Sequence, residues 1–89
     1  MAGITRHQIK AGRDLLGMTQ KELCDAAGLP LITVRRLEGR ADYRGLVSDA
    51  TVERLRAVME GLGLQFLDAG DQAAGEGVAI RRGRSSDTA

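Results

Sequence analysis

Arginine side chains are the groups in this 89-residue chain that are best suited to recognising a ligand, and most of them lie in the first half. Between residues 5 and 44 basic side chains outnumber acidic ones: Arg6, Lys10, Arg13, Lys21, Arg35, Arg36, Arg40 and Arg44 against Asp14, Glu22, Asp25, Glu38 and Asp42. Between residues 45 and 76 acidic side chains predominate, which brings the net charge to only +1. This asymmetry predicts a basic surface for an anionic partner, and ordinary solvated helix faces are the alternative.

Catalytic and metal-binding chemistry lack the residues that they need. Cys24 and His7 are the only cysteine and histidine, which excludes an internal disulfide and a site built on paired thiolates. The sequence has no glycine-rich phosphate loop and no nucleophile with a base, so we expect no enzyme activity, no metal and no cofactor. It also has no apolar run of membrane-spanning length and no signal-peptide core, and we expect a cytoplasmic protein without membrane contact.

Helix start and stop signals divide the first 63 residues into four predicted helices in one mainly α domain. Capping boxes at Thr5–Gln8 and Thr19–Glu22 begin the first two helices, and Ser48 begins the fourth. Pro30 stands in the first turn of the third helix. The predicted helices lie at about residues 5–16, 19–27, 30–38 and 48–62, with a loop over 40–47.

Apolar alternation after the fourth helix predicts two short strands, at 64–67 and 78–81. An isolated hairpin is marginal in water, so these strands need a helix or a second subunit to pack on. We therefore expect residues 64–82 to form a dimerisation element and 83–89 a disordered tail. The expected interface residues are Leu64, Phe66, Val78 and Ile80.

A gapless run of residues from Arg13 to Glu38 resembles the phage-repressor-like, or Xre, helix-turn-helix family. It consists of Arg13, Leu16, Gly17, Thr19-Gln20, Glu22-Leu23, Ala27-Gly28, Thr33-Val34 and Leu37-Glu38. The fourth helix, ending in Gly-Leu-Gly-Leu-Gln-Phe-Leu, and the later Gly-Val-Ala-Ile-Arg extend the resemblance to about residues 8–82. It implies a lambda-repressor-like helix-turn-helix bundle whose third helix enters the major groove of DNA.

By this resemblance, several side chains are expected to contact double-stranded DNA. Gln20 would contact backbone or a base edge, and Leu31, Ile32 and Arg36 occupy base-reading positions. Thr33 would support backbone contacts, and the basic residues Arg35, Arg40 and Arg44 are candidates for phosphate contacts. Arg13 and Glu38 match a structural ion pair of the family, with Arg13 also a phosphate candidate.

Leu31 and Ile32 depart from the family, which usually has polar residues at these positions. They can pack on thymine methyl groups, which predicts T-rich half-sites, or they can form a surface for another protein. The resemblance implies a transcriptional regulator, most simply a repressor, that binds an inverted repeat as a homodimer. The alternative is an antitoxin or anti-activator that acts mainly through a protein partner.

Overall fold

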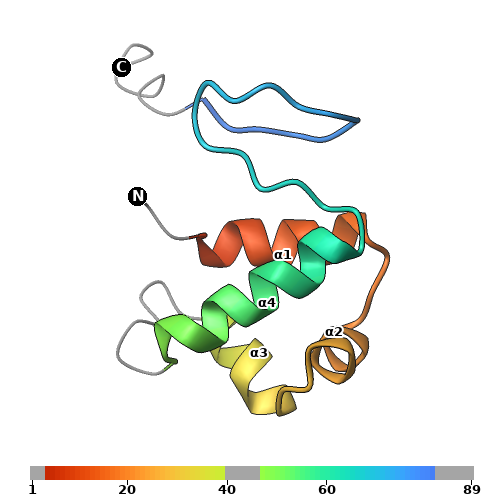
Figure 1. The fold of residues 1–89 in the computed structure, drawn as a ribbon, viewed down its shortest axis with the longest axis vertical. Helices are drawn as coiled ribbons and strands as arrows, with labels where there is room; N and C mark the ends of the chain where they lie inside the picture. The colour runs from red at the N-terminus through yellow and green to blue at the C-terminus, as the bar shows by residue number, and fades with distance from the viewer. Residues whose placement is uncertain (1–3, 40–46, 82–89) are drawn as a thin grey trace.

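The computed structural model describes residues 4–39 and 47–81, which form four helices. Figure 1 shows them as α1 (Arg6–Leu15), α2 (Gln20–Ala27), α3 (Leu31–Gly39) and α4 (Asp49–Gly61). The predicted mainly α fold with four helices is confirmed. The loop predicted over 40–47 falls outside the described residues except for Val47, and the predicted tail at 83–89 falls outside them entirely.

Local capping interactions set the helix starts. The Thr5 hydroxyl accepts a hydrogen bond from the Gln8 amide, and the Gln8 side chain accepts one from the Thr5 amide. Thr19 and Glu22 make the same reciprocal pair at α2. Each pair satisfies two amides that have no partner within the helix, so the start follows from residues three apart.

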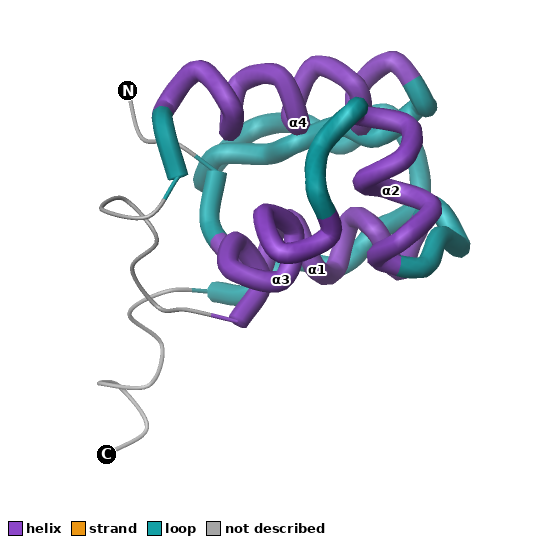
Figure 2. The backbone as a smooth tube through the Cα atoms, turned by 90° about the horizontal axis from the view of Figure 1, so that it is seen from below, coloured by secondary structure: helices purple, strands orange, loops and turns teal. Residues whose placement is uncertain are grey.

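The helices surround an aliphatic core. α3 packs against α1 and α2, and α2 packs against α4, as the view from the side of α2 and α3 shows (Figure 2). The largest completely buried side chains are Ile9, Leu23, Val34, Leu37, Leu55 and Met59. Gly12 is buried in α1 where the Leu64 side chain and the Met59 methyl group approach its backbone. The absence of a side chain at this position therefore lets the segment after α4 pack on α1.

The predicted strands at 64–67 and 78–81 are not seen: no strand occurs among the described residues of this single chain (Figure 2). The first segment is committed to the helices instead. Leu64 packs beside Gly12, Phe66 is buried in the core, and the Leu67 carbonyl accepts a hydrogen bond of 3.1 Å from the Gln8 side chain. The apolar side chains of the first segment and one of its carbonyls are thus already engaged in contacts with the helices of the same chain, and the segment does not form a strand.

After α4 the chain runs away from the helices, and residues 68–81 fold back on themselves as an open loop (Figure 1). The Gln65 side chain braces the loop: its Nε2 donates to the Gln72 carbonyl at 3.1 Å, and its Oε1 accepts from the Ala74 amide at 2.8 Å. Every residue from 71 to 81 is exposed. None of the helices in the described part of the chain is long and apolar enough to cross a membrane.

Candidate nucleic-acid interface

A sharp turn between α2 and α3 sets the orientation of α3. Gly28 ends α2 in the left-handed conformation, with φ of 67°, and the Leu29 amide donates to the Cys24 carbonyl at 2.9 Å. The Pro30 carbonyl accepts from the Thr33 amide at 3.0 Å in the first turn of α3. Only Leu29 and Pro30 then separate this glycine from the first residue of α3, so the two helices meet at a fixed angle.

Val34 and Leu37 anchor α3 by its inner side, and both are completely buried. The opposite side carries Ile32, Arg35 and Arg36, which we call the α3 face. Ile32 is 51% exposed, and both arginines are exposed and form no ion pair with any described residue. Because residues three and four apart are neighbours on a helix, the Ile32 side chain lies next to that of Arg35 and next to that of Arg36. The α3 face thus combines one apolar group with two cations that no described acidic side chain neutralises.

Leu31 and Thr33 are less accessible for contact with DNA than the sequence predicted. Both are half-buried, and Leu31 packs against the hydrophobic core. Of the two apolar residues at the start of α3, only Ile32 is exposed. The structure therefore brings Ile32, rather than a Leu31–Ile32 pair, together with the arginines.

A network centred on Glu38 connects three helices. Glu38 Oε2 accepts from Arg13 Nε at 2.8 Å, and Glu38 Oε1 accepts from Arg13 Nη2 at 3.0 Å. Arg13 Nη1 also donates to the Met18 carbonyl at 2.9 Å. The Glu38 side chain is only 3% exposed and the Arg13 side chain 18%. This bidentate bond to Glu38 raises the pKa of Arg13, against a smaller opposing effect of burial.

Gln20 belongs to the same network. Its Nε2 donates to Glu38 Oε1 at 3.1 Å, and the residue is half-buried. The bond holds the first turn of α2 beside the end of α3 and fixes which way the Gln20 amide points. No local pattern in the sequence reveals this contact, because the partners are 18 residues apart.

One further arginine, Arg54, lies at the surface around the turn. A Cβ atom at Gly28 would lie 3.4 Å from Arg54 Nη2, so the exposed Arg54 side chain of α4 reaches the turn between α2 and α3. The sequence had not singled out Arg54, because only the packing of α4 on α2 brings it there. Arg40 and Arg44, expected at phosphates, lie outside the described residues.

The four residues expected at a dimer interface divide into two groups. Phe66 belongs to the hydrophobic core of the chain and Leu64 packs against it, and the Arg56 guanidinium lies 5.4 Å from the centre of the Phe66 ring. Val78 and Ile80 are 83% and 71% exposed. They lie in residues 76–81, which we call the second arm of the loop. Only the second group is therefore free for another molecule.

Acidic and sulfur side chains do not gather into a metal site: within 4–39 and 47–81 no group of three His, Cys, Asp or Glu residues could hold an ion. Cys24 is buried in α2, where its Sγ donates to the Lys21 carbonyl. Comparisons with protein-family models, with curated proteins and with solved structures found no match to this chain.

Proposed function

We propose that this protein is a sequence-specific DNA-binding transcriptional regulator of the helix-turn-helix type, most simply a repressor, that binds an inverted repeat as a homodimer. The observation that carries the proposal is the α3 face. Two exposed arginines, which form no ion pair within residues 4–39 and 47–81, and one exposed isoleucine occupy the outer side of a helix whose inner side is anchored in the core. An α-helix of this kind fits the major groove of B-DNA, which is roughly 12 Å wide.

Each residue of the α3 face has a chemical role in this proposal. Arg36 donates two hydrogen bonds to O6 and N7 of a guanine, and Ile32 packs on a thymine methyl group. Arg35 neutralises a backbone phosphate, and Arg54 adds charge beside the turn. Gln20 contacts the DNA only in the orientation that its bond to Glu38 allows.

A protein partner on the α3 face is the second candidate, and the exposure of Ile32 is what favours it. Burying this face in an ordinary protein interface would remove two free guanidinium groups from water, which is costly unless the partner supplies acidic groups. Nucleic acid supplies such groups at every phosphate. Charge therefore favours DNA over an antitoxin or anti-activator role as the main function.

The test is selection of binding sites from a random pool of duplex DNA. We expect an enriched inverted repeat whose half-sites contain guanine and thymine. Arg36→Ala should lose preference at one guanine position by about 1–3 kcal/mol, or roughly 5- to 150-fold. Arg35→Ala should weaken binding to all sequences alike and reduce the salt dependence by about one phosphate contact.

Lys10→Ala is the charge-matched control, because Lys10 is exposed on α1 and outside the α3 face. It should leave the selected motif unchanged. If no motif is enriched, or if Lys10→Ala and Arg36→Ala change base preference equally, the proposal of specific readout by α3 is wrong.

A further inference from the structure

The second arm of the loop, residues 76–81, carries two large apolar side chains that the described part of the chain leaves exposed. Val78 and Ile80 are the most exposed of the large hydrophobic residues described, at 83% and 71%. They stand two positions apart, so in an extended chain both point to the same side. This arrangement costs free energy in an isolated subunit and calls for a partner.

The described residues of the chain include no strand that could cover this arm. The segment whose apolar pattern matches it is used elsewhere: Leu64 packs beside Gly12, and Phe66 lies in the core under Arg56. Within described residues 65–81 the one backbone–backbone hydrogen bond is between the Asp71 amide and the Asp68 carbonyl. Residues 76–81 therefore form no backbone–backbone hydrogen bond with the described part of the chain, and they also expose apolar side chains. A segment with both properties can add a strand to another chain.

We propose that residues 76–81 pair with the same segment of a second copy of this chain, as an antiparallel two-stranded ladder. The proposal rests on the homodimeric function proposed above, for which it names the contact. In an antiparallel pair, residues directly opposite each other point to the same face of the sheet. The apolar side chains of two identical strands therefore share one face only when even-numbered residues stand opposite even-numbered ones, with the two-fold axis perpendicular to the sheet. A ladder centred on Ala79 meets this requirement: Ala79 faces its own copy, and Val78 faces the partner's Ile80.

Charge favours a second copy as the occupant and favours the antiparallel direction. The segment begins near Glu76 and ends at Arg81. Antiparallel pairing brings the acidic end of one copy beside the basic end of the other, whereas parallel pairing would bring like charges together. The charges at the two ends of residues 76–81 are thus complementary between two antiparallel copies of this segment.

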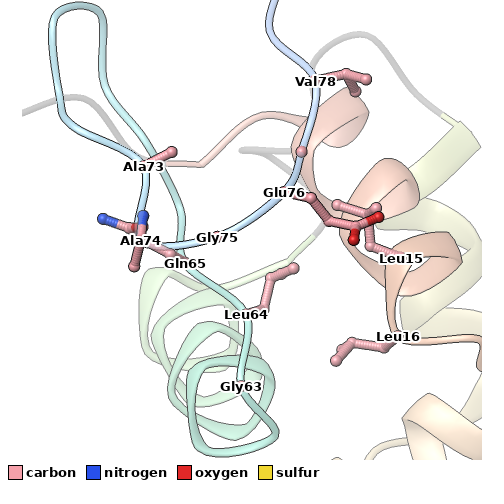
Figure 3. A pocket seen from close by; sticks show the side chains of 11 residues that line it. Leu15, Leu16, Gly63, Leu64, Gln65, Ala73, Ala74, Gly75, Glu76 and Val78 are labelled. Atoms are coloured by element: carbon pink, nitrogen blue, oxygen red, sulfur yellow. The ribbon is translucent and has the colours of Figure 1, made fainter.

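The apolar surface continues from the arm onto α1. Val78 lines a groove of about 400 Å³ together with Leu15, Leu16 and Leu64, whose side chains are seen in Figure 3. Leu15 is exposed as well. In the proposed register the residue opposite Val78 is the partner's Ile80, so this side chain would lie beside the groove and extend the contact beyond the two strands.

Disulfide trapping tests the pairing and its register. In a Cys24→Ala background, Ala79→Cys should form a cross-linked dimer on mild oxidation. Facing residues in an antiparallel pair have Cα atoms about 4.5–5.5 Å apart, within the roughly 4.4–6.8 Å range of disulfides. Ala69→Cys, at an exposed position of the same loop, is the matched control. We expect at least roughly tenfold more dimer for Ala79→Cys than for this control.

Sedimentation of the uncross-linked protein gives the second measurement. The unmodified chain should be dimeric at micromolar concentration, and Ile80→Lys should weaken the dimer at least roughly tenfold. Equal cross-linking at positions 69 and 79, a monomeric unmodified chain, or a dimer that Ile80→Lys leaves intact would overturn the proposal. Both measurements are made without DNA, so a dimer that selects no DNA motif would refute the proposed function alone.

Discussion

The ion pair between Arg13 and Glu38 allows a quantitative test of what holds α3 in place. The Glu38 carboxylate accepts two hydrogen bonds from Arg13 and one from Gln20, and its side chain is 3% exposed. Replacing Arg13 and Glu38 by methionine, singly and together, forms a double-mutant cycle. The cycle isolates the free energy of interaction between the two side chains.

The two single replacements should have unequal costs. Breaking a buried ion pair by removing one partner costs about 3–5 kcal/mol, because an uncompensated charge stays in the interior. Arg13→Met leaves a carboxylate with almost no access to water, so its cost should lie near the upper value. Glu38→Met leaves an arginine that is 18% exposed and still bonded to the Met18 carbonyl, so its cost should lie near the lower value.

The double variant should be less destabilised than the sum of the single variants, by about 2 kcal/mol or more. An apolar pair of similar volume often replaces a buried ion pair at little cost. Since a small domain has only about 5–15 kcal/mol of stability in total, each single change should shift the urea midpoint strongly. Glu38→Gln is the milder variant to use if Glu38→Met does not fold.

Urea unfolding followed by far-ultraviolet circular dichroism measures all four free energies. Lys21 and Asp25 are the control pair, since they form an ion pair of 3.0 Å in which both side chains are largely exposed. Their coupling should be much smaller because water screens both charges. A coupling for Arg13 and Glu38 no larger than that of this control would refute the argument that the network fixes α3.

The same network predicts how stability depends on pH. The hydrogen bond to Glu38 raises the pKa of Arg13 in the folded state. The contribution of this bond to stability is therefore complete at pH values below the unfolded-state pKa of Arg13. It is lost only as pH rises through the folded-state pKa of Arg13. Both lie in the strongly alkaline range. The difference in unfolding free energy between the unmodified chain and Arg13→Met should therefore be constant from neutral to mildly alkaline pH, and a marked slope there would contradict this assignment.

Three further substitutions test the packing, each measured by urea unfolding. Gly12→Ala should destabilise by about 1–3 kcal/mol because its methyl group would meet the Leu64 side chain, whereas Gly61→Ala, in open space at the end of α4, should stabilise slightly. Gly28→Ala should cost about 1–2 kcal/mol because φ is 67° there. Phe66→Ala should cost about 3–5 kcal/mol regardless of protein concentration, and a concentration-dependent loss would instead place Phe66 in a dimer interface.

The helix boundaries could be read from the sequence because the interactions that set them are local. Thr5 with Gln8, and Thr19 with Glu22, satisfy helix amides across three residues. Gly28 takes the left-handed conformation that ends α2. The periodicity that predicted Val34 and Leu37 on the inner side of α3 is equally local, and both side chains are buried. For the candidate site, this periodicity was enough to predict that Ile32, Arg35 and Arg36 face outward.

The C-terminal segment could not be predicted in this way, because strand pairing depends on residues far apart in the chain. The alternation of Leu64 and Phe66 is the same in a strand as in a segment that packs on helices. The space beside Gly12 and the hydrogen bond from Gln8 to the Leu67 carbonyl decided between them. Both features exist only once α1 and α4 have been brought together.

By itself, the sequence determined the four helices and the outward positions of the α3 face, since caps and periodicity act within a few residues. Only the tertiary structure decided that Leu31 packs on the core, that Gln20 is bonded to Glu38, and that Arg54 reaches the turn at Gly28. The same packing placed Leu64 and Phe66 against the helices and left Val78 and Ile80 exposed. The physical reason is that burial and long-range hydrogen bonds depend on which helices meet, and no short stretch of sequence contains that information.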